Sequence, residues 1–89
     1  MAKNKLFTEN AWQDYLYWQK EDRKTVNKIN TLLEDIARNG YDGLGKPEPL
    51  TGPLAGFWSR RINDKDRLIY KVEGENVCVL ACRFHYGDK

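Results

Sequence analysis

Three kinds of side chain in this sequence could together cleave a phosphodiester bond. Glu48 lies between Pro47 and Pro49, His85 is the only histidine of the chain, and arginines recur through the second half. A carboxylate can remove the proton of an RNA 2′-hydroxyl, an imidazolium can protonate the leaving 5′-oxygen, and a guanidinium can stabilise the charge that develops on phosphorus. These residue types suit general acid–base cleavage of RNA, a reaction that needs no metal ion.

The sequence contains few residues that could form other kinds of site. One histidine, two cysteines and no pair of acids at ligand spacing do not predict a metal site, and we expect no cofactor. No glycine-rich phosphate loop follows a strand, and a catalytic triad would need Ser59 and an acid that the strands do not offer. Cys78 and Cys82 would lie about 13 Å apart along one strand, too far for a disulfide. We therefore predict buried, reduced cysteines and a cytoplasmic protein.

The length and composition indicate one small domain spanning residues 1–89. Apolar residues make up 40% and charged residues 31% of the chain, which excludes a disordered tail and a coiled coil. No apolar run could span a membrane, and the first residues do not indicate a signal peptide. The net charge is only +2, so a nucleic-acid surface would require cations clustered on one face.

The first half of the chain predicts a short strand over residues 5–7 followed by two helices. Thr8 can cap the first helix and Asp22 the second, because short polar side chains accept hydrogen bonds from the first free backbone amides. Gly40 would end the second helix in a left-handed conformation. The apolar residues of the second helix follow a period of 3.6, namely Val26, Ile29, Leu32, Leu33 and Ile36.

The second half predicts a functional loop and three strands. Residues 40–56 hold five of the seven glycines and all three prolines, and the two prolines beside Glu48 stiffen its backbone. Strands are expected over residues 57–63, 67–73 and 77–86. The order β-α-α-β-β-β predicts an α+β fold, with a helical hairpin packed on one face of a small, mostly antiparallel sheet.

Alternation of side chains along these strands indicates one cationic sheet face. On each strand, one alternating set of side chains is mostly apolar and suits the helices. In the last strand this apolar set includes Cys78 and Cys82, and it leaves Val77 and Val79 in the opposite set. Arg60 falls in the apolar set of its strand although it is charged, which predicts either an edge position or a bulge. A solvated face with scattered charges would give the same pattern, although arginine favours phosphate. The opposite set contains five basic side chains, namely Arg61, Arg67, Lys71, Arg83 and His85.

Each candidate also has a purely structural interpretation. A glutamate between prolines is commonly a solvated loop residue, and a histidine near a C-terminus is commonly a surface residue. Tyr86 could be the aromatic end of a strand rather than a platform on which a base stacks. The residue types alone therefore leave open whether a catalytic site exists.

Five segments between residues 5 and 86 form motifs in a fixed order. They are Asp14–Gln19, Gly45–Leu50, Gly56–Ile62, Arg67–Tyr70 and Ala81–Tyr86. Their order and spacing resemble the YoeB/Txe toxins of the RelE/ParE superfamily of bacterial toxin–antitoxin modules. The resemblance implies a RelE-like fold and a ribosome-dependent messenger RNA endonuclease. Such toxins enter the ribosomal A site and cut the message there, which inhibits translation.

The resemblance also assigns roles to the candidate residues. It implies that Glu48 is the general base, that His85 is the general acid and that Arg67 stabilises the phosphate. The products would be a 2′,3′-cyclic phosphate, or a 3′-phosphate after hydrolysis, and a 5′-hydroxyl. The substrate-binding residues predicted with these motifs are Arg61, Tyr86, Lys46 and Arg83.

The resemblance further implies partners and alternatives. A YefM-like antitoxin would cover the site with an acidic segment, operator DNA would be bound only through the antitoxin, and family members often form homodimers. Thr51 stands where the family often has lysine, Phe84 replaces a frequent tyrosine, and residues 87–89 extend beyond the usual end. A non-enzymatic inhibitor of a target such as gyrase, as in the ParE branch, and a module that only represses its operon are the alternatives.

Overall fold

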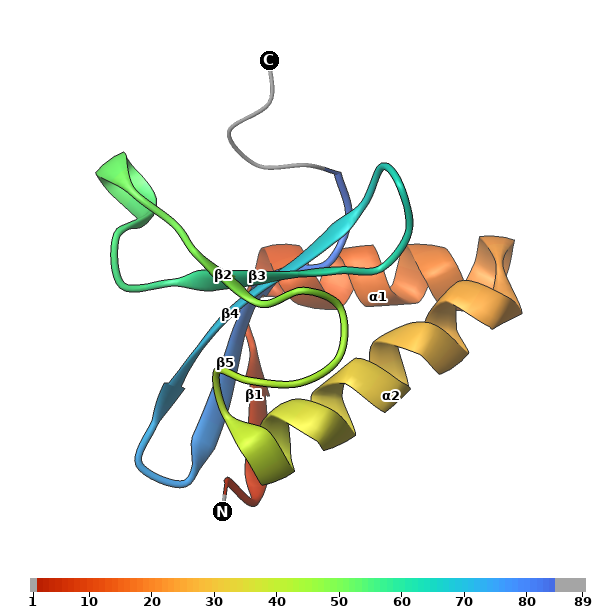
Figure 1. Ribbon diagram of the computed structural model, residues 1–89. Coiled ribbons are helices and arrows are strands. Elements are labelled where there is room, and N and C mark those ends of the chain that lie inside the picture. The colour runs from red at the N-terminus through yellow and green to blue at the C-terminus, as the bar shows by residue number, and fades with distance from the viewer. Residues whose placement is uncertain (1, 85–89) are drawn as a thin grey trace.

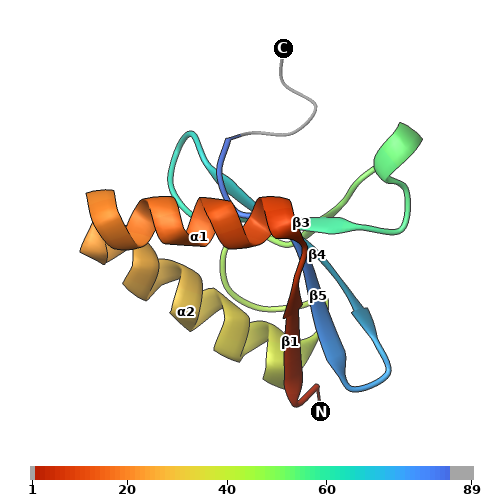
Figure 2. The ribbon, with the colours of Figure 1, turned by 180° about the vertical axis from the view of Figure 1, so that it is seen from behind.

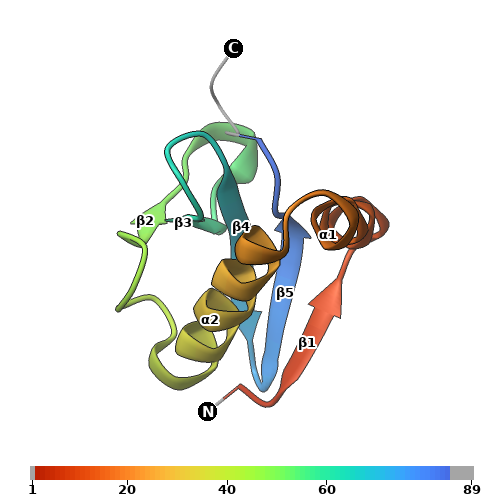
Figure 3. The same ribbon diagram turned by 90° about the vertical axis from the view of Figure 1, so that its right-hand side faces the viewer.

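The computed structural model describes residues 2–84, which form two helices and a five-stranded sheet (Figure 1). Figure 3 shows α2 crossing one face of the sheet, with α1 beside it. The predicted α+β architecture is confirmed. The elements follow in the order β1 (Asn4–Phe7), α1 (Glu9–Glu21), α2 (Arg23–Asn39), β2 (Glu48–Pro49), a 3₁₀ helix (Gly52–Leu54), β3 (Trp58–Arg61), β4 (Arg67–Glu73) and β5 (Asn76–Ala81).

The strands are arranged in the order β1-β5-β4-β3-β2. β1 pairs with β5 in parallel, and the other pairs are antiparallel. Figure 2 shows β1 at one edge, next to α1. The two-residue strand β2 forms the other edge, inside the segment 40–56 that the sequence predicted to be a loop. The prediction missed β2 and the 3₁₀ helix because prolines and glycines dominate both.

The helix boundaries follow the predicted capping residues. The Thr8 hydroxyl accepts a hydrogen bond from the amide of Ala11 at 3.0 Å, and the Asp22 carboxylate accepts one from the amide of Lys24 at 3.1 Å. Gly40 follows the last residue of α2 with φ of 66°, a conformation that glycine adopts without steric cost.

The core lies between the helices and one face of the sheet. Apolar residues of α2 pack there against Leu68 and Tyr70 of β4 and against Val77 and Val79 of β5. This contradicts the predicted parity of the last strand, which placed both valines on the cationic face. Half-buried Cys78 lies opposite Lys71 on the other face.

A β-bulge explains this error. Ile69 pairs with Ala81 while Tyr70 pairs with Val79, so Leu80 is an extra residue on β5. The side-chain parity therefore changes at Leu80, and Cys82 beyond it belongs to the core. Both cysteines are free, as predicted, but only Cys82 is buried, because Cys78 lies on the face away from the core. Burial raises the pKa of Cys82 to about 12, which keeps its thiol protonated.

Two predicted strands are longer than the observed ones. β3 covers residues 58–61 rather than 57–63, and β5 ends at Ala81 rather than at residue 86. His85 and Tyr86 lie outside the described residues. Among the helices of residues 2–84, none has the length and apolar character that crossing a bilayer requires.

Candidate functional site

Glu48, Arg61 and Arg67 lie on the sheet face turned away from α2, which we call the far face. Arg61 of β3 lies directly opposite Arg67 of β4, and Glu48 of β2 lies opposite Ser59. Since Ser59 is two residues before Arg61, all these side chains share the far face. Strand geometry puts the Cα atom of Glu48 about 8 Å from that of Arg61 and about 12 Å from that of Arg67.

The Glu48 side chain is exposed, and it makes no hydrogen bond or ion pair with any residue between 2 and 84. Its position comes from the backbone on both sides. Before it, the Gly45 carbonyl accepts the Arg61 amide at 2.7 Å, and after it the Leu50 amide donates to the Phe57 carbonyl at 2.9 Å. The carboxylate is therefore held in place by its strand but remains free to act on a ligand.

The two arginines on the far face have different surroundings. Nη1 of Arg67 donates to the carbonyls of Asn63 at 2.8 Å and Asp66 at 3.1 Å, in the turn before β4. The Arg61 side chain is exposed and bonds to nothing within residues 2–84. Nε and Nη2 of Arg67 and the whole guanidinium of Arg61 are thus uncommitted in this part of the chain. Two such cations at paired positions of neighbouring strands are suited to binding an anionic group such as phosphate.

Lys46 lies near this group, but Arg83 does not. Exposed Lys46 follows Gly45, whose carbonyl bonds to Arg61, so Lys46 enters β2 beside that arginine. The guanidinium carbon of Arg83 lies 3.4 Å from the ring centroid of Tyr17 in α1 and 4.5 Å from that of Phe84. The side chain of Arg83 is thus directed to α1 instead of toward Arg61 and Arg67, the direction that the alternation predicted, and β5 ends two residues before it.

Lys71 also lies apart from the arginine pair. Its Nζ atom is 5.1 Å from the centroid of the Phe57 ring and 3.0 Å from a carboxylate oxygen of Glu73. Of the predicted cationic face, only Arg61 and Arg67 keep guanidinium N–H groups without a partner, either a hydrogen-bond acceptor or an aromatic ring, within residues 2–84. Lys46, which was predicted separately as a substrate-binding residue, lies next to Arg61.

The described chain ends beside the arginine pair. The amide of Phe84 donates to the carboxylate of Asp66 at 2.6 Å, and the carbonyl of Phe84 accepts the amide of Arg67 at 3.0 Å. Two residues earlier, the Asp14 carboxylate accepts the amide of Cys82 at 3.0 Å, and burial raises the pKa of Asp14. Two buried carboxylates thus fix the backbone that directly precedes His85. The roles predicted for His85 and Tyr86 remain predictions.

The sequence predicted either an edge position or a bulge for Arg60, and both predictions are wrong. Arg60 lies neither at an edge nor in a bulge, but on the core face with 0% of its surface exposed, paired with Asp35 of α2. This hydrogen bond and ion pair hold the pKa of Asp35 below its ordinary value. The signal was present in the sequence, since a charged residue of core parity requires a buried partner.

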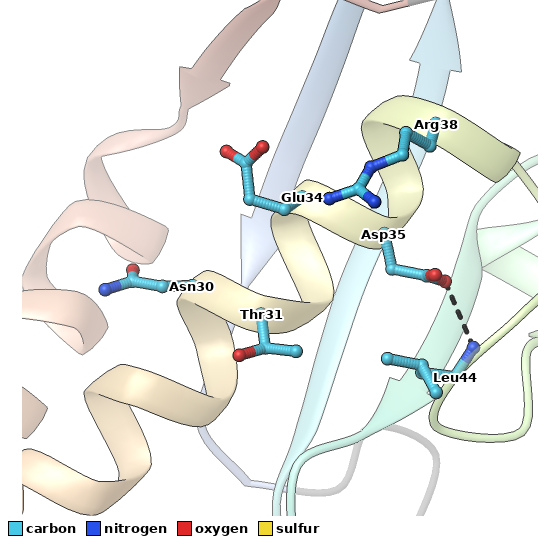
Figure 4. A pocket seen from close by; sticks show the side chains of 6 residues that line it. All are labelled: Asn30, Thr31, Glu34, Asp35, Arg38 and Leu44. Carbon is cyan, nitrogen blue, oxygen red and sulfur yellow. Dashed lines mark hydrogen bonds between the residues drawn. The ribbon is translucent and has the colours of Figure 1, made fainter.

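A hollow between α2 and the loop that follows it lies close to this pair (Figure 4). Glu34 and Arg38 line it from the exposed side of α2, and Leu44 lines it from the loop. It contains none of the predicted site residues, so it is separate from the Glu48 and arginine group.

The comparison with known proteins identifies the class of this chain. Residues 7–86 match the family described as the YoeB-like toxin of bacterial type II toxin–antitoxin systems. Toxin YoeB of Escherichia coli K12 is 49% identical over 81 residues, which are 91% of this chain and 96% of that protein. Toxin YoeB of Synechocystis is 50% identical over 80 residues, or 90% and 93% of the two chains. The protein is therefore a toxin of a type II toxin–antitoxin system.

Solved structures agree with this assignment. A YoeB/ParE toxin from Agrobacterium tumefaciens superposes with a TM-score of 0.91 at 45% identity, covering 94% of this chain and all of that one. A heterotetrameric YoeB–YefM complex and a YoeB dimer, both from Staphylococcus aureus, give TM-scores of 0.89 and 0.90 at 45% identity, each over 97% of this chain and all of the other. Within its class, the chain belongs to the YoeB-like toxin family.

Proposed function

We propose that this toxin is a ribosome-dependent endonuclease that cuts messenger RNA in the A site without a metal ion. The observation that carries the proposal is the Glu48 carboxylate, which has no partner within residues 2–84 and shares the far face with Arg61 and with the Nε and Nη2 atoms of Arg67, also unpaired in that range. A base and a pair of cations within reach of one phosphate are what 2′-hydroxyl attack requires. Membership of the YoeB-like family supports the same reaction.

In the proposed reaction, Glu48 removes the proton of the 2′-hydroxyl, and the 2′-oxygen attacks the adjacent phosphorus. Arg67 and Arg61 stabilise the negative charge on the phosphoryl oxygens. The bond from phosphorus to the 5′-oxygen breaks, and His85 protonates that oxygen. One product carries a 2′,3′-cyclic phosphate and the other a 5′-hydroxyl. His85 follows directly after Phe84, whose backbone bonds to Asp66 and Arg67.

Lys46 and Tyr86 complete the proposed substrate site. Lys46 lies at the entrance to β2 beside Arg61, where its ammonium group can contact a neighbouring phosphate. Tyr86 follows the proposed acid and offers a ring on which a base can stack. Arg83 contributes less to binding in this proposal than Arg61, because it is stacked between Tyr17 and Phe84.

We also propose that a YefM-like antitoxin inhibits this toxin in the cytoplasm. The support is the YoeB–YefM complex of the Staphylococcus aureus relative. An acidic antitoxin segment could bind the free cations of the far face and occupy the phosphate position. Binding to operator DNA would occur only through that complex. The YoeB dimer of the same relative supports a homodimer of the free toxin.

Primer extension on a message under translation tests the catalytic proposal. The toxin should create new 5′ ends at the A-site codon, and Glu48→Gln should reduce their rate of formation about 10²- to 10⁴-fold, the usual contribution of a general base. Absence of A-site cleavage by the unmodified toxin would refute the proposal. If Glu48→Ala combined with His85→Ala still arrests growth fully, the chain acts as a non-enzymatic inhibitor instead.

A further inference from the structure

The structure assigns a positioning role to the ion pair between buried Arg60 and half-buried Asp35: it fixes the loop of residues 40–45 and thereby sets the place of Glu48 on the far face. This inference rests on the proposed function of Glu48 as the general base. Neither Arg60 nor Asp35 touches the far face, so both act through the backbone that leads to Glu48.

Every donor of the Arg60 guanidinium is used within this anchor. Nε donates to the Tyr70 hydroxyl at 3.1 Å, and Nη1 donates to the Asp35 carboxylate and to the Leu44 carbonyl, the latter at 2.9 Å. Nη2 donates to the carbonyls of Gly40 and Asp42, both at 2.8 Å. A guanidinium has five N–H groups. All five are bonded here, and three of them hold carbonyls of one loop.

Asp35 holds the same loop from the side of α2. Its carboxylate accepts the amide of Leu44 at 3.0 Å, as Figure 4 shows, and the side-chain amide of Asn39 at 2.8 Å. The loop passes so close that a Cβ atom on Gly43 would lie 2.2 Å from Asp35 Oδ2, and Gly43 has φ of +118°. Only glycine fits both the space and the backbone conformation at this point.

The anchored loop connects to Glu48 through two short steps. Gly45 lies against α2 and β3, where an added Cβ would be 3.0 Å from Leu32 Cδ2 and 3.1 Å from the Arg61 carbonyl oxygen. Its own carbonyl accepts the Arg61 amide, and residues 46 and 47 lead directly into β2. β2 has only two residues at the sheet edge. So short a pairing stabilises its register weakly, and the anchored loop supplies the missing constraint.

A buried ion pair often adds little net stability compared with apolar residues of similar volume. Here the pair determines where three loop carbonyls lie, which apolar side chains could not do. Loss of the anchor should therefore affect the orientation of Glu48 more than the binding surface of the far face. Small displacements of a catalytic group lower the rate of the chemical step strongly.

Single-turnover cleavage of ribosome-bound message, with the full-length toxin in excess, tests this inference. Arg60→Lys and Gly43→Ala should each reduce the rate at saturating toxin by about 10- to 100-fold, while the toxin concentration at half-saturation stays unchanged. Gly43→Ala removes neither charged group and disturbs the loop through the added Cβ atom, so it still tests the inference if Arg60→Lys does not fold. Tyr15→Phe is the matched control, because it removes an exposed hydrogen bond from the Tyr15 hydroxyl to Asn30, between the helices and away from the loop.

The inference also predicts non-additivity with the base. In a Glu48→Gln background, Gly43→Ala should cause no further loss, because its effect passes through Glu48. A rate loss that follows melting temperature across all variants, Tyr15→Phe included, would overturn the positioning role. So would full activity of Gly43→Ala alongside an impaired Glu48→Gln, a result that leaves the proposed function intact. Full activity of Glu48→Gln would refute the proposed function itself.

Discussion

Arg60 and Arg61 are neighbours in the chain, yet they lie in opposite environments. Arg60 is on the core face, fully buried, and all its donors bond to the protein. Arg61 is on the far face, exposed, and its side chain bonds to nothing within residues 2–84. The alternation of a strand separates the two arginines completely. The number of bonds already made by a guanidinium thus distinguishes a structural cation from one available to a ligand.

Removal of the buried arginine should produce the largest change in stability. Arg60→Ala leaves Asp35 and three loop carbonyls without their donor, and breaking such a pair costs about 3–5 kcal/mol. Urea unfolding followed by circular dichroism measures this change. A loss below about 1 kcal/mol would mean that the Arg60–Asp35 pair behaves like a surface ion pair. Arg60 would then not differ from Arg61 in its contribution to stability.

The exposed arginine should show the reverse behaviour. Arg61→Ala should change the free energy of unfolding by no more than about 0.5 kcal/mol, because the side chain is unpaired in the described structure. Its cleavage rate on ribosome-bound message should fall about 10²-fold if the guanidinium stabilises charge at phosphorus. Unfolding and cleavage measured on the same preparation test both statements. Unchanged cleavage would exclude Arg61 from the site.

Two carboxylates should respond to pH with opposite signs. The pKa of Asp35 is lowered by Arg60, so its stabilising effect is complete above its ordinary value of 3.8 and disappears as pH falls through the lowered pKa. The pKa of Asp14 is raised by burial, so stability decreases as pH rises from 3.8 through the raised value. The free energy of unfolding should be measured between about pH 2 and 7. In Asp35→Asn the loss of stability at low pH should be smaller, and in Asp14→Asn the loss of stability with rising pH should be absent. The same pH profile in both variants would contradict these assignments.

The smallest expected effect concerns Arg83. Its guanidinium stacks on Tyr17, and cation–π contacts of this kind contribute about 0.5–1 kcal/mol at exposed sites. Arg83→Ala should therefore reduce stability by about that amount and reduce cleavage less than Arg61→Ala does. A cleavage loss equal to that of Arg61→Ala would show that Arg83 leaves Tyr17 to contact the message.

Local sequence signals predicted much of this fold. Thr8, Asp22 and Gly40 bound the helices as expected, since capping depends on residues adjacent in the chain. The bulge at Leu80 was not predicted, because nothing in an apolar run marks where one residue is added. It caused the wrong parity for β5.

The site was predicted in part for similar reasons. Arg61 and Arg67 share a face as expected, because regular alternation holds in β3 and β4. Glu48 joins this face through β2, a strand that the sequence did not predict. Arg83 was misplaced since the end of β5 is set by contacts with α1, distant in sequence. The partner of Arg60 was missed because Asp35 resembles any polar residue on the outer side of a helix.

The most direct test of the account uses a translated message with a single 2′-deoxyribose at the nucleotide preceding the cut. We expect the toxin to leave this message intact in the ribosome while cleaving the all-ribose control, because no hydroxyl is present for Glu48 to deprotonate. Cleavage of the 2′-deoxy message at the same position would contradict the proposed chemistry.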